Sequence, residues 1–522
     1  MRRLSLALLT LATAAITVVV SPAGATAAPA TPASSANVGI SSDALDAATI
    51  PDLQLRMSIG SLTSVQLTST YLGRIKAVDP KIHAVLFLDP TALRQARESD
   101  QRRRTGHLRS LLDGIPVLLK DNIDTKNLPT TAGSRALLAA NPKQDAPLVD
   151  NLRAAGAIIL GKTNLSEWAN FRSTMSTSGW SGVGAQTNNP YVLDRNPCGS
   201  SSGSGAAVAA SLSQVAIGTE TDGSIVCPSG ANGNVGIKPS LGVVSGVGVV
   251  PISHQQDTAG PIGRHVIDVA ITLAALSGRR DTNYVAAAAL GRFTALRGAR
   301  IGVWAMAGQD PGVDKVMQST VATLVKAGAT VVNVVPANQD IVGNDEFPAL
   351  LTEFNHDLDA YLATRPGVPQ TLQALIAFDQ QDPVELSKFG QEIFQQAVVA
   401  PPITDPTYQQ QRATATNLAQ HSIDDLISAD HLDAIVAPTN GPAWVTNYAT
   451  GDIVSVGSSG PAAVAGYPDI TVPAGFAGPL PIGVSFMAGK FSDAHLLAIA
   501  SAFERVANAR RAPTFLPTSP TP

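Results

Sequence analysis

The sequence predicts an α/β protein in which helices cover a β-sheet. Short apolar segments that are typical of buried strands alternate along the chain with longer segments of helical spacing. Residues 295–304 and 328–334 are two β-type segments that flank the helical run VDKVMQSTVATLVKAG, which is a βαβ-like pattern. A length of 522 residues would by itself suggest several domains. No break in composition and no long linker divides residues 46–511, so we expect one large domain.

The N-terminal half is predicted to alternate helices and short strands. A first helix lies within residues 59–85, and Thr63 or Ser64 is its expected cap. After it we expect, in order, a strand and a polar helix within residues 86–106, a strand at residues 117–119, a helix at residues 148–155, a strand at residues 157–161 and another helix. Residues 172–197 are polar and irregular, as long loops at functional sites often are.

The C-terminal half contains a helix-rich segment between strand regions. Residues 340–430 are rich in Gln, Asp and helix formers and carry few strand signals, so we expect a variable helical region that walls a substrate cleft. Strands return at residues 432–440 and 467–475 and in LPIGVSFMAG, and the run SDAHLLAIASAFERVA predicts a final helix. The tail at residues 512–522 is predicted to be loose.

The N-terminal segment has the composition of a secretory signal peptide. Arg2 and Arg3 precede the apolar run LSLALLTLATAAITVVV, and Ala25-Thr26-Ala27 supplies the small residues of a cleavage site. An uncleaved anchor is the alternative, because the apolar run is about 17 residues long. The small-residue site favours cleavage near Ala27. We therefore expect residues 1–27 to be removed, residues 28–45 to form a flexible leader, and the mature protein to be secreted.

The overall composition fits a globular enzyme. Hydrophobic residues make up 44% of the chain and charged residues 15%, which argues against a disordered or coiled-coil chain. A formal net charge of −4 gives no reason to expect nucleic-acid binding, which would require a basic patch or stripe. The one dense basic run, Arg102-Arg103-Arg104, is interpreted as the solvated end of a helix.

Residues 196–229, NPCGSSSGSGAAVAASLSQVAIGTETDGSIVCPS, have an unusual density of serine and glycine. Glycine permits positive φ and close approach of the backbone, which suits a site where N–H groups point at a ligand. A flexible Gly/Ser linker is the alternative. We favour a functional site, because the two serine clusters are joined by the apolar run AAVAASLSQVAIG, which would be buried.

Both cysteines of the chain lie beside these serine clusters. Cys198 precedes Ser200 by two residues, and Cys227 follows Ser224 by three. If the two serines meet in space, the thiols of an exported protein could form a disulfide. Two buried, free thiols are the alternative.

A catalytic serine needs a base, and the usual bases are missing. None of the eight histidines lies in the Ser/Gly stretch or beside Lys120. The segment GSSSG at residues 199–203 fits the letters of G-x-S-x-G, but no strand directly precedes it as a nucleophile elbow requires, and TDGSI lacks the second glycine. Residues 156–163, GAIILGKT, fit the letters of G-x-x-x-x-G-K-[ST], but this run is predicted to be a buried strand rather than a phosphate loop. The sequence has no cluster with zinc-ligand spacing. Lys120 directly follows a short apolar strand, where an ammonium is costly to bury unless it is paired or neutral. Lys120 is therefore the remaining candidate base, and a lysine that extends to solvent is the alternative.

Three motifs carry a resemblance to a known family: DGIPVLLKDNIDT, CGSSSGSGAAVAA and GTETDGSIVCPSGANGNVGIKPS. With the 24-residue spacing between Ser200 and Ser224, they resemble the amidase signature family from about residue 59 to residue 507. Within that family, NLSEWANFRSTMSTSGWSG, NPCGSSSGSG and GTETDGSIVCP are most similar to bacterial peptide amidases. The resemblance implies a single large α/β domain at residues 46–511, with a mixed, twisted central β-sheet covered on both faces by α-helices.

The resemblance also implies a Ser-Ser-Lys triad. Ser224 would be the acyl-forming nucleophile, and Ser200 would be the bridging serine after a cis peptide bond at Gly199. Lys120 would be the ultimate base. Burial favours the neutral form of a lysine, and a hydroxyl both donates and accepts, so the three groups can relay a proton.

Further roles follow from the same resemblance. The backbone N–H groups of Thr221, Asp222 and Gly223 would form the oxyanion hole. Asp222-Gly223 stands where the family usually has two glycines, and the Asp222 side chain could position the hole by a hydrogen bond. Ser176 and Ser178 lie in the loop that faces the substrate in this family and are predicted to bind it. The remaining serines of the first cluster, Ser201, Ser202 and Ser204, are predicted to cap a helix or bond the backbone.

The implied activity is amide hydrolysis without a metal or other cofactor. The leading substrates are C-terminal amides of peptides or related carboxamides, from which ammonia is released. An aryl or aliphatic acylamidase is the alternative, and an amidotransferase subunit is disfavoured by the signal peptide. Apart from a small-molecule or peptide amide, we expect no nucleic acid, no membrane after signal cleavage and no obligate protein partner.

Overall fold

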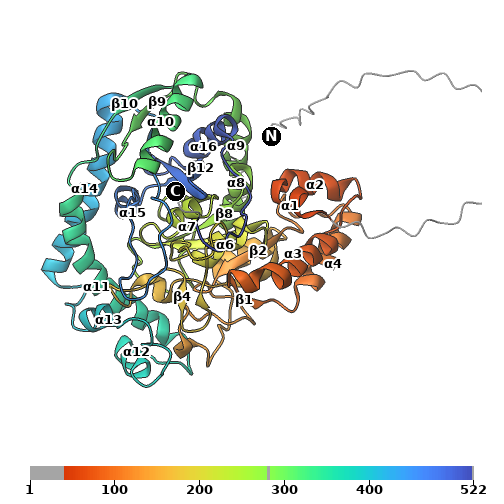
Figure 1. Cartoon of the computed structure of the whole chain (residues 1–522). Helices are drawn as coiled ribbons and strands as arrows, with labels where there is room; N and C mark the ends of the chain where they lie inside the picture. Colours follow the sequence, from red (N-terminus) through yellow and green to blue (C-terminus); the bar gives the residue numbers. More distant parts are fainter. Residues whose placement is uncertain (1–39, 279–282, 520–522) are drawn as a thin grey trace, which may run out of the picture. The chain divides into compact units, whose positions relative to one another are not determined.

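An 11-stranded β-sheet is the centre of the computed structural model, which describes residues 40–278 and 283–519 (Figure 1). Its strand order is β1-β3-β2-β6-β8-β7-β12-β13-β11-β9-β10. The parallel groups β3-β2-β6 and β11-β9-β10 flank an antiparallel middle, so the sheet is mixed, as the resemblance implies. The strands are β1 (Val85–Leu88), β2 (Pro116–Lys120), β3 (Ile158–Thr163), β6 (Val215–Glu220), β7 (Val235–Lys238), β8 (Thr258–Gly263), β9 (Arg300–Val303), β10 (Thr330–Asn333), β11 (Ala434–Pro438), β12 (Asp469–Ala477) and β13 (Leu480–Met487), while β4 (Trp180–Ser181) and β5 (Ala185–Gln186) pair separately.

Helices cover both faces of this sheet (Figure 1). In the first half they are α1 (Ser42–Ala47), α2 (Ile50–Ser58), α3 (Ser64–Val78), α4 (Ala92–Arg104), α5 (Pro147–Ala154), α6 (Ser202–Ala209) and α7 (Val226–Ala231), with 3₁₀ turns η1 (Asp79–Lys81), η2 (Arg135–Leu137) and η3 (Glu167–Asn170). In the second half they are α8 (Val266–Leu276), α9 (Asn283–Thr294), α10 (Pro311–Lys326), α11 (Gln339–Ala363), α12 (Leu372–Asp379), α13 (Glu392–Ala397), α14 (Pro406–Asp430), α15 (Gly460–Ala465) and α16 (Asp493–Ala507). Within the described residues, none of these helices is long and apolar enough to cross a membrane.

The strand β2 positions Lys120 because it is buried between two parallel neighbours. All five residues of its sequence PVLLK are buried, which fits a continuous apolar run between β3 and β6. In the register of the sheet, Leu119 lies opposite Lys162 in β3 and Ile217 in β6. The carboxyl ends of β2 and β6 therefore meet at one edge, where Lys120 ends β2 and Glu220 ends β6.

The segment between β10 and β11 is helical, as predicted. The structure forms α11 to α14 there and has no strand in this part of the described chain. A separate hydrophobic cluster joins α11, α12 and α13 to η3 through the aromatic residues Trp168, Phe171, Phe354 and Phe394. That the helical region at residues 340–430 walls a substrate cleft remains a prediction.

The structure differs from the sequence expectations in three segments. The helix expected after residues 157–161 is only the short turn η3, since Trp168, Ala169 and Asn170 have positive φ. The apolar run between the two serine clusters is buried, as expected, but its second half forms the central strand β6, which was not predicted from the sequence. The tail is not loose throughout its described part, because the N–H groups of Phe515 and Leu516 donate to the Pro190 and Tyr191 carbonyls.

The predicted signal peptide and residues 28–39 of the predicted leader lie outside the described residues. The end of the leader is ordered, because α1 begins at Ser42. Its Leu45 is fully buried in the main core, and the Asp46 carboxylate pairs with the Arg510 guanidinium at 2.8 Å. These contacts join the beginning of the fold to its C-terminal end.

Candidate active site

Lys120 ends β2 with a fully buried side chain. Its Nζ donates to Ser200 Oγ at 2.8 Å, to Thr219 Oγ1 at 2.9 Å and to the Thr219 carbonyl at 3.1 Å, all of which are uncharged oxygens. Burial lowers the pKa of Lys120 from 10.5 to about 7, against the opposing effect of the Asp257 and Glu220 charges. The amine is therefore available in its neutral form near pH 7, which a proton acceptor requires.

Ser200 lies at the start of the segment that leads into α6. The peptide bond between Gly199 and Ser200 is cis, as the resemblance implies. The Ser200 side chain is fully buried and receives the hydrogen bond from Lys120. The Cβ that any other residue would place at position 199 would stand 2.2 Å from Ser166 Oγ, so only glycine fits there.

Ser224 lies between the end of β6 and the start of α7 and is 8% exposed. Its carbonyl accepts a hydrogen bond of 3.1 Å from the N–H of Ser201, which holds the two serine segments together. The buried carboxylate of Glu220 accepts hydrogen bonds from the N–H groups of Ile225 and Val226 at 2.7 and 3.0 Å, and so holds the turn. In the described structure the Ser200 and Ser224 hydroxyls share no hydrogen bond, so the contact between them in the predicted relay remains a prediction.

Thr221, Asp222 and Gly223 form the turn before Ser224. Gly223 has a φ of +73°, a conformation that glycine adopts without steric cost. None of the three backbone N–H groups donates to a protein acceptor among the residues that the structure describes. Such groups are available to an incoming oxygen, which is what an oxyanion hole needs. The Asp222 carboxylate accepts a hydrogen bond from Ser459 Oγ at 2.5 Å.

A disulfide joins Cys198 to Cys227. Cys198 directly precedes Gly199 and the cis peptide bond, and Cys227 lies in α7. The structure therefore resolves the two alternatives left by the sequence in favour of the bridge. The disulfide ties the Ser200 segment to the helix that follows Ser224.

The two serines predicted to bind substrate are both buried, Ser176 at 7% exposure and Ser178 at 2%. Ser176 Oγ accepts a hydrogen bond from the N–H of Ser173 at 3.3 Å. Ser178 Oγ accepts one from Asn170 Nδ2 at 2.9 Å and would stand 2.9 Å from a Cβ at Gly199, so it lies beside the Ser200 segment. The structure places Ser178 at the site, while a role for either serine in binding substrate remains a prediction.

The other serines of the first cluster bond the backbone and do not cap α6. Ser201 Oγ donates to the Thr219 carbonyl at 3.1 Å, Ser202 Oγ to the Cys198 carbonyl at 2.6 Å and Ser204 Oγ to the Ile217 carbonyl at 3.1 Å. No side chain caps the N-terminus of α6. Ser201 and Ser204 thus fasten α6 to β6.

Sequence reasoning missed Thr219 and the segment at residues 441–459. Thr219 holds Lys120 and also accepts a hydrogen bond from Asn122 Nδ2 at 2.9 Å. The C-terminal segment reaches the site at two points, where Asp452 accepts hydrogen bonds from the N–H of Ser178 at 3.0 and 3.1 Å and Ser459 donates to Asp222. A strand that would place Thr219 beside Lys120 is hard to see within a Ser/Gly stretch, and contacts from so far along the chain leave no local signal.

No group of three or more His, Cys, Asp or Glu residues in the described part of the chain could hold a metal ion. The site supplies a buried amine of low pKa, two serines and a turn whose N–H groups have no protein acceptor among the described residues. This set fits nucleophilic attack on a carbonyl carbon.

The fold and the site together define a class of enzyme. The family model for amidases matches residues 66–497, and the chain belongs to this family, the amidase signature enzymes. It is therefore an enzyme that hydrolyses amides.

Individual relatives extend over nearly the whole chain. The chain is 39% identical over 495 residues to a probable amidase of Arabidopsis thaliana, covering 90% of this chain and 92% of the relative. It is 45% identical to the native peptide amidase from Stenotrophomonas maltophilia, whose X-ray structure superposes with a TM-score of 0.85 over 90% of this chain and 99% of that one. It is also 34% identical over 475 residues to a glutamyl-tRNA(Gln) amidotransferase subunit from Salinispora arenicola, covering 85% of this chain and 94% of the relative.

Proposed function

We propose that the chain hydrolyses carboxamides through an acyl-enzyme at Ser224, with Ser200 and Lys120 as the proton relay. The observation that carries the proposal is the 2.8 Å contact between Lys120 Nζ and Ser200 Oγ. A buried amine with a pKa of about 7 that contacts only uncharged oxygens can accept a proton at neutral pH.

In the first half of the reaction, Ser224 Oγ attacks the amide carbon. Its proton passes to Ser200, and the Ser200 proton passes to Lys120. The oxygen of the tetrahedral intermediate accepts hydrogen bonds from the N–H groups of Thr221, Asp222 and Gly223. The C–N bond then breaks, and Lys120 returns the proton through Ser200 to the departing nitrogen. Water attacks the acyl ester by the same route, which releases a carboxylic acid and restores Ser224.

The substrates that we propose are C-terminal amides of peptides, which release ammonia. The similarity to a peptide amidase at 45% identity, over 99% of that chain, supports this class. Ile453 and Val454 directly follow Asp452, which binds the N–H of Ser178, and they are 60% and 51% exposed. These side chains suit contact with the apolar part of a peptide. Aryl or aliphatic amides remain the alternative substrates.

An amidotransferase subunit is a second candidate, which the similarity to the Salinispora protein favours. Such a subunit would pass ammonia to an acceptor on tRNA rather than release it. We propose free hydrolysis because the N-terminal sequence has the features of an export signal, while tRNA is cytosolic.

We also propose that the protein is secreted, with its signal peptide cleaved near Ala27. The disulfide between Cys198 and Cys227 supports this proposal, because such bonds persist in oxidising compartments. Mass determination of the protein recovered from the culture medium would test it. Retention of the full chain in the cell would contradict secretion.

The test of function is ammonia release from a panel of peptide amides, anilides and aliphatic amides. We expect the highest kcat/KM with peptide amides, and loss of at least about 10⁴-fold in kcat in the Ser224→Ala variant. A slow substrate should leave its acyl group on the peptide that contains Ser224, detected by mass spectrometry. Turnover in Ser224→Ala near that of the wild type would rule out the mechanism, and no release from any peptide amide would favour the alternative substrates.

A further inference from the structure

The side chain of Gln256 lies behind the turn that precedes Ser224. It is 2% exposed. Its Nε2 donates to the Thr221 carbonyl at 3.0 Å and to Glu346 Oε1 at 2.6 Å, while its Oε1 accepts from Arg412 Nη1 at 3.0 Å. Both Nε2 hydrogens and the Gln256 oxygen therefore have partners, so the amide is held in one orientation.

Arg412 determines that orientation. Its Nε and Nη2 both donate to the Glu353 carboxylate, at 2.7 and 2.5 Å, which leaves Nη1 to face Gln256. A guanidinium only donates, so the Gln256 atom that it contacts must be the oxygen, and the Gln256 nitrogen then faces Thr221. Glu353 is held in turn by hydrogen bonds from Tyr408 Oη at 2.8 Å and Ser253 Oγ at 2.6 Å.

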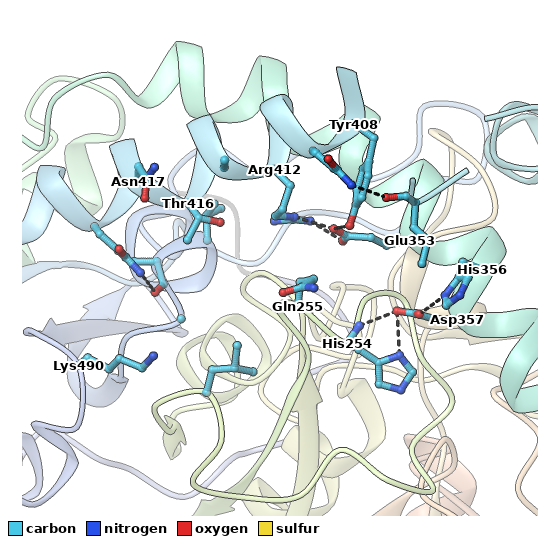
Figure 2. Close-up of a pocket in the computed structure, with 18 residues that line it drawn as sticks. His254, Gln255, Glu353, His356, Asp357, Tyr408, Arg412, Thr416, Asn417 and Lys490 are labelled. Atoms are coloured by element: carbon cyan, nitrogen blue, oxygen red, sulfur yellow. Dashed lines mark hydrogen bonds and ion pairs between the residues drawn. The ribbon is translucent and has the colours of Figure 1, made fainter. Parts of the chain in front are cut away.

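Figure 2 shows Arg412 and Tyr408 on α14 meeting Glu353 on α11. The three residues line a surface cavity, whose volume is about 640 Å³. Of these wall residues, Arg412 also reaches Gln256. Gln255 lines the same cavity, is exposed and has no side-chain hydrogen bond among the described residues. The chain thus offers two adjacent glutamines, of which only one contacts the turn.

The hydrogen bond from Gln256 to the Thr221 carbonyl sets the direction of the Asp222 N–H group. The peptide bond between Thr221 and Asp222 is trans, so its carbonyl and its N–H point in opposite directions. Because Gln256 holds the carbonyl on one side, the N–H of Asp222 points to the other. The Thr221 hydroxyl donates to Asp257 Oδ1 at 2.6 Å, which holds the same residue at a second point.

We propose that Gln256 is a positioning residue that directs the N–H of Asp222 at the oxygen of the reacting carbonyl, with Arg412 holding Gln256 in the required orientation. The inference rests on the proposed oxyanion role of this turn. Gln256 itself touches no reacting atom and acts through the peptide plane. Its effect belongs to the transition state, where the negative oxygen forms, more than to substrate binding.

The Gln256→Glu and Gln256→Met variants together test the inference. An ionised Glu keeps the shape and the acceptor for Arg412 but cannot donate to Thr221, and because it would face the Glu346 carboxylate, which lies 2.6 Å from the replaced Nε2, Gln256→Met is measured beside it as the variant that lacks the donor without adding a charge. Removal of one oxyanion donor costs about 10²–10³-fold in kcat in other enzymes. For a misdirected donor we expect a fall in kcat of about tenfold to hundredfold, with KM within about threefold of the wild type. A peptide aldehyde, which adds reversibly to a serine as a tetrahedral adduct, should lose affinity by the same factor as kcat/KM. Gln255→Glu makes the same charge change one residue earlier and should keep wild-type kcat.

Three outcomes would overturn the inference: wild-type kcat in folded Gln256→Glu, a change confined to KM, or unchanged affinity for the aldehyde. If Gln256→Glu does not fold, judged by circular dichroism and thermal unfolding, Gln256→Met decides, because it lacks the donor without adding a charge; normal kcat in it overturns the inference. The Ser224→Ala variant distinguishes failure of the inference about Gln256 from failure of the proposed acyl-enzyme mechanism. If that variant is inactive and Gln256→Glu is fully active, the inference alone fails; if Ser224→Ala turns over normally, the proposed mechanism fails.

Discussion

Two buried lysines lie at the ends of neighbouring parallel strands, and their partners differ. Lys162 in β3 donates to two carbonyls and a hydroxyl, and its Nζ lies 3.2 Å from a carboxylate oxygen of Asp121. Lys120 in β2 donates only to uncharged oxygens of Ser200 and Thr219. Burial lowers the pKa of both lysines, but a direct counter-charge favours the ammonium form only of Lys162.

The difference shows that burial alone does not make a lysine a base. An ion-paired lysine such as Lys162 cross-links the strand ends to the loop around Asp121. A lysine whose amine contacts a hydroxyl, as Lys120 contacts Ser200, can exchange a proton with that hydroxyl. We therefore expect that replacing Lys120 lowers activity, whereas replacing Lys162 lowers the free energy of unfolding.

The largest expected effect is on activity in Lys120→Met. Because the variant lacks the amine, we expect kcat for ammonia release to fall by at least about 10³-fold. The free energy of unfolding should not fall, since methionine fills the space without the cost of burying an amine. Steady-state kinetics and denaturant unfolding measure both quantities. A kcat within tenfold of the wild type would remove Lys120 from the mechanism.

The next effect is on stability in Lys162→Met. Loss of one partner of a buried ion pair leaves Asp121 uncompensated, which costs about 3–5 kcal/mol in free energy of unfolding. The kcat of the folded fraction should stay within a few fold of the wild type. The double variant Lys162→Met with Asp121→Asn is the control, and it should recover part of the lost stability. A kcat as low as that of Lys120→Met would contradict the comparison.

A smaller effect should appear in the pH dependence of stability. The pKa of Lys120 is about 7 in the fold against 10.5 for an unperturbed lysine, so the unfolded chain binds more protons between these values. The wild type therefore loses stability as pH falls from 10.5 to 7, and the loss is complete below 7. Lys120→Met lacks this contribution, so its stability relative to the wild type should rise as pH falls over that range and then level. Parallel curves for the two proteins would show that the pKa of Lys120 is not lowered.

Much of the fold could be predicted from sequence because its signals are local. The apolar run before Lys120, the alternation of strands and helices and the cap at Thr63 all lie within a few residues of the elements that they define. β6 was missed because its six residues VAIGTE lie inside a stretch dominated by serine and glycine. η3 was missed because nothing in its local sequence indicates the left-handed backbone of Trp168, Ala169 and Asn170, and the Phe394 ring that contacts Trp168 lies far along the chain.

The site was predictable only in part, because some of its contacts join residues that lie far apart in the chain. The motifs around Lys120, Ser200 and Ser224 are contiguous in sequence, and the resemblance assigns their roles. The segment GAIILGKTN places Lys162 after an apolar run, as PVLLK places Lys120. Nothing in the local sequence indicates that only Lys162 forms an ion pair with Asp121. The contact between Gln256 and Arg412 spans 156 residues, so no sequence pattern announces it.

The pH dependence of kcat/KM for a peptide amide tests the central claim most directly. If neutral Lys120 accepts the proton, log kcat/KM should rise with unit slope below pH 7, bend at about 7 and stay level above it. The folded Lys162→Met variant should show the same bend. A bend that disappears with Lys162, or a rate that rises with unit slope up to about pH 10, would contradict the role given to Lys120.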